Sequence, residues 1–166
     1  MIAEFKFFNS HPKPMRVLLL TNLIYAMVMP IVELFVGAYI MRNSSDLSLV
    51  VIFQLAVYTG IPLTFLINGY LLNGVKIAWL YSLGMILSGI SMFAMMSLDE
   101  LSTSGIFFAG LIMGLSYGFF WANRDFLALN TTVDSNRNYY YGIETFFYKI
   151  AGIVIPFGAV ALIAAT

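Results

Sequence analysis

Long apolar stretches are the feature that most constrains this chain. Five segments of mostly apolar residues cover positions 15–41, 47–72, 77–97, 105–129 and 139–165. About 20 consecutive apolar residues form a helix that is long enough to cross the hydrocarbon core of a bilayer. Transmembrane strands are shorter, about 9–11 residues, and alternate between apolar and polar side chains, which these segments do not. The sequence therefore predicts an all-α polytopic membrane protein with a five-helix transmembrane domain over residues 15–166.

The composition supports this fold class and limits the functions to consider. Hydrophobic residues make up 61% of the chain and charged residues 10%, whereas a soluble domain is typically about 25% charged. The net charge is zero, so we expect no nucleic acid partner, because phosphate binding needs a basic patch. The chain has no cysteine, and His11 is its one histidine. We therefore expect no catalytic residues, no metal and no cofactor, and hence no enzyme.

The distribution of lysine and arginine predicts the orientation. Connections on one side of the predicted helices, with the N-terminal segment 1–14, hold six basic residues: Lys6, Lys13, Arg16, Lys76, Arg124 and Arg137. The opposite side holds Arg42. Basic residues accumulate on the cytoplasmic side of membrane proteins. We therefore predict a multi-pass protein of the cell membrane, with the segment 1–14 and the polar loop 130–138 in the cytoplasm.

Polar side chains inside the predicted helices are the candidate functional residues. A charge at the centre of a membrane helix costs about 2.5–3.5 kcal/mol on insertion scales, so such side chains normally face protein or a water-filled cavity. The candidate substrate or ion pathway consists of Asn22, Glu33, Gln54, Tyr58, Asn68, Trp121, Arg124, Asp125, Glu144 and Lys149. We expect Gln54, Tyr58 and Asn68 to share one face of their helix.

Each of these residues also has a purely structural interpretation. Glu33 could be a carboxyl group that bonds to a neighbouring helix. Gln54 and Asn68 could be amides that hold helices together. Arg124 and Lys149 could extend their charged ends to the lipid headgroups.

Small residues in the last two predicted helices indicate close helix packing. Gly110, Gly114 and Gly118 repeat every four residues, which lets the backbone of another helix approach along that face. In the last helix, Lys149 shares a face with Gly152 and Pro156. The predicted packing residues are Gly110, Gly114, Gly118, Gly152, Pro156 and Gly158.

The same region resembles the major facilitator superfamily of secondary transporters. The resemblance rests on "GLIMGLSYGFFWANRD" at 110–125, a glycine-stepped helix that leads to an arginine, and on "GIVIPFG" at 152–158. In the loop "GYLLNGVKIAW", Gly69 and Leu71 match the family pattern, and Asn73 stands where the family has aspartate. The resemblance implies two six-helix bundles that enclose a midplane site and alternate access by rocking. This chain would supply five of those twelve helices.

Two functions follow from these observations. The first is the N-terminal part of a secondary active transporter, coupled to a proton or ion gradient. Its partners would be the lipid bilayer, a small-molecule solute, and the remaining transporter helices or a second membrane chain. The alternative is a non-transporting assembly or interaction subunit whose buried charges pair with the helices of a partner.

Overall fold

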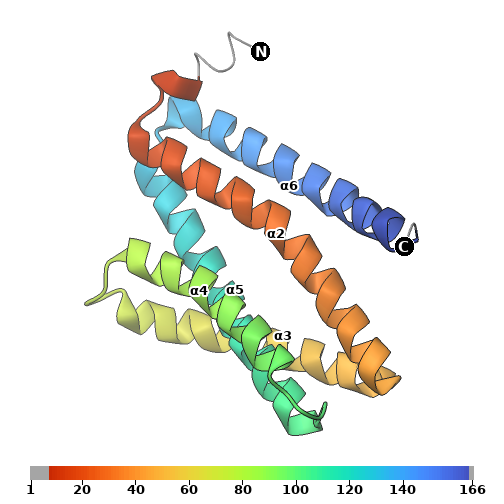
Figure 1. The fold of residues 1–166 in the computed structure, drawn as a ribbon. Helices are drawn as coiled ribbons and strands as arrows, with labels where there is room; N and C mark the ends of the chain where they lie inside the picture. The colour runs from red at the N-terminus through yellow and green to blue at the C-terminus, as the bar shows by residue number, and fades with distance from the viewer. Residues whose placement is uncertain (1–7, 165–166) are drawn as a thin grey trace. The chain divides into compact units, whose positions relative to one another are not determined.

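The computed structural model describes the backbone of residues 8–164. Five long helices account for most of this part of the chain: α2 (Lys13–Ser44), α3 (Leu47–Leu71), α4 (Ile77–Met96), α5 (Thr103–Thr131) and α6 (Asp134–Ala164), as Figure 1 shows. No strand occurs among the described residues. The all-helical fold class is therefore confirmed.

Four of these helices, α2 to α5, are long and apolar enough to cross a membrane. The prediction of membrane-spanning helices is therefore confirmed for these four helices by their length and composition. Over its described residues, α6 does not meet the same criterion of length and composition. It carries four charged side chains, Asp134, Arg137, Glu144 and Lys149. The structure thus shows four candidate spans, and the predicted fifth is not among them.

The prediction of a polar loop at 130–138 is wrong, because most of these residues are helical. α5 continues to Thr131 and α6 begins at Asp134. The backbone N–H of Val133 donates to Oδ1 of Asn136 at 2.8 Å, and Arg137 pairs with Asp134 at 2.8 Å. A side chain that reaches back to the start of a helix and an acid in its first turn both stabilise a helix N-terminus. These polar residues therefore begin α6.

The chain divides into two compact units, residues 1–34 with 126–166 and residues 35–125. In the first unit, the N-terminal part of α2 packs with α6. In the second unit, α3, α4 and α5 pack together, and α5 is the most buried: half of its apolar window is buried, against 28% in α3 and 22% in α4. α5 is therefore the central helix of the second unit.

The contact between α3 and α5 runs through the predicted glycine face. A Cβ atom added to Gly110 would lie 2.6 Å from the carbonyl oxygen of Phe53, and one added to Gly114 would overlap the carbonyl oxygen of Val57. On α3, a Cβ at Gly60 would lie 2.9 Å from Cα of Gly114. Such distances leave no room for a side chain, so the two backbones touch. The structure also places Gly118 against Thr64 of α3.

α4 packs on α5 through small polar residues. Ser116 Oγ donates to the carbonyl oxygen of Gly84 at 2.7 Å, and Ser91 Oγ donates to that of Ala109 at 2.8 Å. A Cβ at Gly84 would lie 2.6 Å from the backbone nitrogen of Phe120. These hydrogen bonds between helices fix α4 and α5 side by side.

The glycines of α6 differ from those of α5. A Cβ at Gly152 or Gly158 would meet no described heavy atom within 4 Å. The expected close packing of another helix at Gly152 and Gly158 is therefore not found among the described residues. Both glycines are exposed, and Gly152 and Pro156 line a cavity instead.

Candidate functional site

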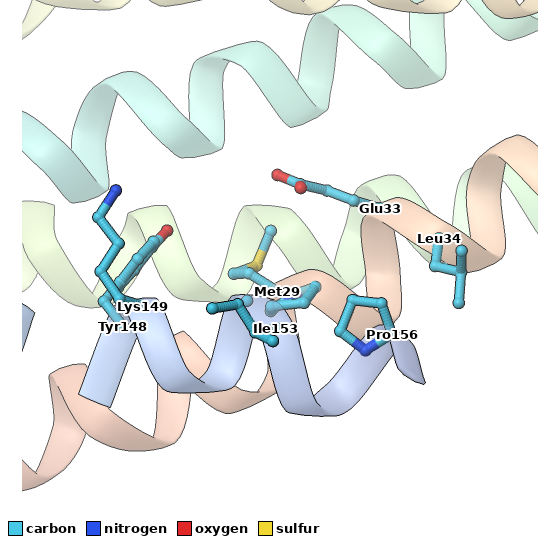
Figure 2. Close-up of a pocket in the computed structure, with 9 residues that line it drawn as sticks. Met29, Glu33, Leu34, Tyr148, Lys149, Ile153 and Pro156 are labelled. Carbon is cyan, nitrogen blue, oxygen red and sulfur yellow. The ribbon is translucent and has the colours of Figure 1, made fainter. Parts of the chain in front are cut away.

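A cavity lies in the first unit, between α2 and α6 (Figure 2). Its volume of about 490 Å³ is within the range of about 300–1,000 Å³ that is usual for small-molecule sites. The lining residues are Met29, Pro30, Glu33, Leu34, Tyr148, Lys149, Gly152, Ile153 and Pro156. We refer to this cavity as the α2–α6 pocket.

The helical period explains why these residues meet. On α2, the lining positions 29, 30, 33 and 34 fall on one face, and on α6 the positions 149, 152, 153 and 156 do the same. Glu33 and Lys149 thereby become the two charged side chains of one pocket. Figure 2 shows both projecting to the same side of their helices. Both are exposed in the described structure.

The rest of the α2–α6 pocket is mainly apolar. Met29, Leu34 and Ile153 contribute aliphatic surface, and Tyr148 contributes an aromatic ring. Because Gly152 has no side chain and no described atom lies near its Cβ position, it keeps that wall open. An acid and a base in an otherwise apolar cavity form a site that can bind charged or hydrogen-bonding groups and orient them.

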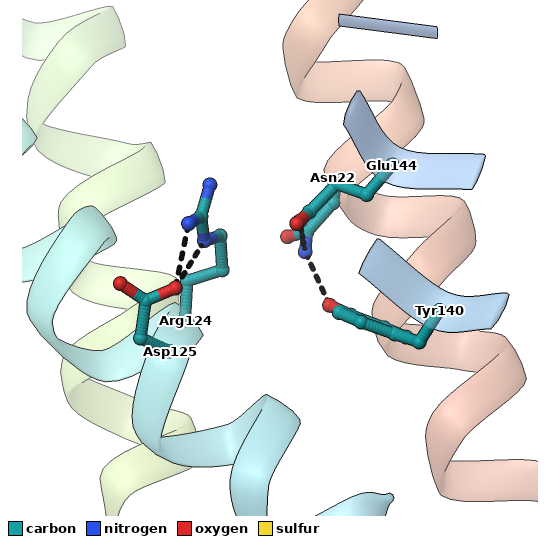
Figure 3. Close-up of polar contacts among 5 residues, drawn as sticks. All are labelled: Asn22, Arg124, Asp125, Tyr140 and Glu144. Carbon is teal, nitrogen blue, oxygen red and sulfur yellow. Dashed lines mark hydrogen bonds and ion pairs between the residues drawn. The ribbon is translucent and has the colours of Figure 1, made fainter. Parts of the chain in front are cut away.

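A second cluster is buried between the same two helices (Figure 3). The side-chain amide of Asn22 on α2 donates to the hydroxyl of Tyr140 at 2.7 Å and to Oε1 of Glu144 at 2.5 Å. The three side chains are 3%, 0% and 5% exposed, respectively. The structure thus places Glu144 with Asn22, and Arg137 pairs with Asp134 in the first turn of α6. We name Asn22, Tyr140 and Glu144 the buried polar cluster.

Tyr140 was not among the predicted site residues. It lies four residues before Glu144, so the two share one face of α6. That four-residue spacing could have indicated Tyr140 as a site residue. The usual interpretation of a tyrosine near a membrane surface is instead an interfacial anchor. Only the packing of α2 shows that its hydroxyl group is buried.

Arg124, Asp125 and Trp121 form a local group at the C-terminal part of α5, and Figure 3 shows the contact between Arg124 and Asp125. Arg124 Nη2 lies 2.5 Å and Nε 2.9 Å from Oδ1 of Asp125. The guanidinium carbon lies 4.2 Å from the centre of the Trp121 ring, which is a cation–π distance. Arg124 thus pairs with its sequence neighbour on the same helix, and the side chain of Asp125 is 53% exposed.

Asn68 pairs with Asn123, which connects α3 to α5. Asn123 Nδ2 donates to Oδ1 of Asn68 at 2.7 Å and to the carbonyl oxygen of Phe119 at 2.8 Å. Both asparagines are buried. This geometry agrees with the structural interpretation of Asn68, in which its amide holds two helices together.

Of the three residues expected on one face of α3, Asn68 is buried, whereas Gln54 and Tyr58 are not. The buried residues of α3 are Leu49, Phe53, Ala56, Val57, Gly60, Thr64 and Asn68. Gln54 is exposed and Tyr58 is 70% exposed. The glycine face of α5 determines which side of α3 is covered, and that side is rotated away from Gln54 and Tyr58.

Comparison with known proteins adds two relatives. No protein-family model and no solved structure matches the chain. It is 23% identical over 133 residues to the uncharacterized protein YqgE of Bacillus subtilis (strain 168), covering 80% of this chain and 31% of that protein. It is 24% identical over 135 residues to an uncharacterized protein in the sodM 3′ region of Geobacillus stearothermophilus, covering 81% of this chain and 63% of the relative. The chain thus spans less than two thirds of the length of either relative.

Proposed function

We propose that this chain is part of a secondary active transporter that moves a small solute by alternating access, coupled to a proton or ion gradient. The α2–α6 pocket is the observation that carries the proposal. Glu33 and Lys149 come from two different helices and line one cavity of about 490 Å³. Ionisable residues within membrane helices are costly and usually mark a substrate or ion pathway. A pocket that collects two of them fits a solute site.

In this proposal α6 is the fifth membrane-spanning helix. Its charged residues have positions that agree with that role. Asp134 and Arg137 lie in the first turn and pair with each other, Glu144 is buried against Asn22, and Lys149 lines the pocket. None of the four side chains then needs to face lipid, so the free-energy cost of placing α6 in the membrane is lower than its charge suggests.

The proposed architecture is the first five helices of a major facilitator bundle in the cell membrane, with the N-terminus in the cytoplasm. The glycine contact of α5 with α3 and the positive-inside distribution of basic residues support it. The two bacterial relatives are longer than the stretch they share with this chain, which agrees with a whole protein that is longer than this chain. Within that assembly, Gln54, Tyr58, Trp121, Arg124 and Asp125 are further pathway candidates.

The experiment that tests the proposal needs no known substrate. The chain has no cysteine, so a cysteine in place of Gly152 provides a labelling site in the pocket, at a position where an added Cβ meets no described atom within 4 Å. In the whole protein in its native membrane, a transporter should allow a membrane-impermeant maleimide to reach Gly152→Cys from both sides of the membrane. Ile86→Cys, on the exposed apolar face of α4, is the control and should react from neither side.

The alternative function is a non-transporting assembly or interaction subunit. The exposure of Glu33 and Lys149 in the described structure also suits a pocket that a helix of a partner chain fills. That function predicts that Gly152→Cys is protected from both sides in the assembled complex and becomes reactive when the partner is removed. Labelling from both sides in the intact assembly would exclude it.

A further inference from the structure

We propose that the turn between α3 and α4 binds an anionic phospholipid, with the headgroup at Asn73 and Lys76 and one acyl chain along α4. The turn consists of residues 72–76 and joins two helices that are each long and apolar enough to cross a membrane (Figure 1). The carrying observations are two adjoining hollows at this turn and a single positive charge beside them. The inference concerns the exposed surface of the second unit and does not depend on the proposed transport function.

The first hollow is an apolar groove along the start of α4, with a volume of about 320 Å³. It is lined by Val75, Trp79, Leu80, Ser82, Leu83 and Ile86. These positions recur at helical spacing on one face of α4, and from Trp79 to Ile86 the helix rises by about 10 Å. The hydroxyl of Ser82 donates to the carbonyl oxygen of Ala78 at 2.9 Å, so its hydrogen is used within the helix. The groove therefore offers an elongated apolar surface that suits part of an acyl chain.

The second hollow lies at the turn itself and meets the groove at Val75, which lines both. Its other lining residues are Tyr70, Leu71, Asn73 and Gly74. The backbone N–H groups of residues 73–75 donate to carbonyl oxygens in the last turn of α3, at 2.9–3.3 Å. The donors for a ligand are therefore side chains: the hydroxyl of Tyr70, the amide of Asn73 and, directly after Val75, the ammonium of Lys76. All three side chains are exposed, and such donors suit the phosphate and glycerol oxygens of a headgroup.

Charge complementarity selects the class of lipid. Lys76 is the one charged residue between Asp46 and Asp99 in the sequence, and none of the described acidic side chains forms an ion pair with it. An anionic phospholipid brings a negative charge to this ammonium, whereas a zwitterionic lipid also brings a positive charge of its own. Lys76 lies on the side that the basic residues predict to be cytoplasmic, and anionic lipids of the cytoplasmic leaflet attract such residues.

Trp79 provides the probe, because it lines the groove. The test uses the whole protein in nanodiscs, with every tryptophan other than Trp79, Trp121 among them, replaced by phenylalanine. Bromine atoms on an acyl chain quench tryptophan fluorescence on contact. Quenching by brominated phosphatidylglycerol and by brominated phosphatidylcholine, at equal mole fractions, therefore compares the binding of the two lipids in the groove. We expect phosphatidylglycerol to bind about fivefold more tightly, which is the contribution of one basic residue near an anionic membrane surface.

Two variants and one relocated probe test the assignment. Lys76→Gln should reduce the ratio of the two binding constants to about one, and Lys76→Arg should retain it, because arginine keeps the charge. The relocated probe combines Trp79→Phe with Phe93→Trp, since Phe93 is 75% exposed near the other end of α4. There we expect the two lipids to quench equally.

Equal binding of the two lipids at Trp79 would overturn the inference, as would a preference that Lys76→Gln retains or that Lys76→Arg loses. The same preference at position 93 would also overturn it, because the preference would then belong to the whole surface of α4. Absence of quenching by either lipid would mean that another helix or a second copy covers the groove, which contradicts a lipid site. Labelling of Gly152→Cys tests transport separately, so either proposal can fail without the other.

Discussion

Asn22 of α2 holds Glu144 of α6 through a 2.5 Å hydrogen bond from its side-chain amide to Oε1. Both residues are almost fully buried, so this contact joins the N-terminal half of α2 to α6 in a place where water does not compete. The same amide reaches Tyr140 at 2.7 Å. The buried polar cluster therefore aligns the two helices whose opposite charges, Glu33 and Lys149, line the pocket.

Replacing Asn22 with leucine should destabilise the packing of α2 on α6. The change removes the hydrogen bonds that the amide donates to Tyr140 and Glu144, and leaves Glu144 buried without that donor. Loss of one partner of a buried polar group typically costs about 1–3 kcal/mol, and we expect a loss in that range in the free energy of unfolding, followed by denaturant titration in detergent. Thr21→Ala is the matched control, because the Thr21 hydroxyl donates within its own helix, to the carbonyl oxygen of Val17 at 2.8 Å. Equal stability of the two variants would contradict the role of the cluster.

The glycine face of α5 gives a second test. Gly114→Ala places a methyl group against the carbonyl oxygen of Val57, and overpacking of this kind typically costs about 1–3 kcal/mol. Gly89→Ala in α4 meets no described atom within 4 Å, so its higher helix propensity should leave stability unchanged or raise it by up to about 1 kcal/mol. Thermal unfolding of both variants side by side measures the difference. A Gly114→Ala protein as stable as the Gly89→Ala protein would show that α3 and α5 do not touch there.

The pair Asn68 and Asn123 is suited to a double-mutant cycle. Hydrogen bonds between membrane helices average about 0.6 kcal/mol and reach about 1.7 kcal/mol, so we expect a coupling energy in that range between Asn68→Val and Asn123→Leu. The double variant should be more stable than the sum of the single losses predicts, because no buried amide then lacks its partner. Strictly additive losses would mean that the two amides do not interact.

The orientation is tested by labelling at two exposed positions. Asn43→Cys at the end of α2 should react with an impermeant maleimide in intact cells, whereas Ser135→Cys in the first turn of α6 should react only after the membrane is opened. The reason is the placement of six basic residues on the side of Ser135. The reverse pattern would invert the proposed topology and remove one support for the resemblance to the major facilitator superfamily.

The sequence was sufficient to predict the helices but not every boundary. Apolar length determines where a helix can cross a bilayer, so α2 to α5 lie close to the predicted ranges. The start of α6 was missed because polar residues there look like a loop, whereas Asp134, Asn136 and Arg137 stabilise a helix N-terminus. The glycine face of α5 could also be predicted, because a four-residue repeat places small residues on one face of a helix, where another backbone can approach closely.

Which faces meet was harder to predict, because it depends on two helices at once. Gln54, Tyr58 and Asn68 were expected on one face of α3, and only the fit to α5 determines that Asn68 is buried and that Gln54 and Tyr58 are exposed. Glu33 and Lys149 were each recognised as costly at membrane depth, but their spacing along the chain says nothing about a shared pocket. For the same reason the sequence did not single out Tyr140 as a partner of Asn22.

In the proposed transport cycle, the α2–α6 pocket opens alternately to the two sides of the membrane. The most direct measurement follows the labelling rate of Gly152→Cys from each side, in right-side-out and inside-out vesicles of one preparation, while the pH is varied. We expect both rates to be measurable and to change in opposite directions, because a single site cannot be open to both sides at once. A rate from one side that stays at zero under all conditions, or two rates that rise and fall together, would contradict alternating access.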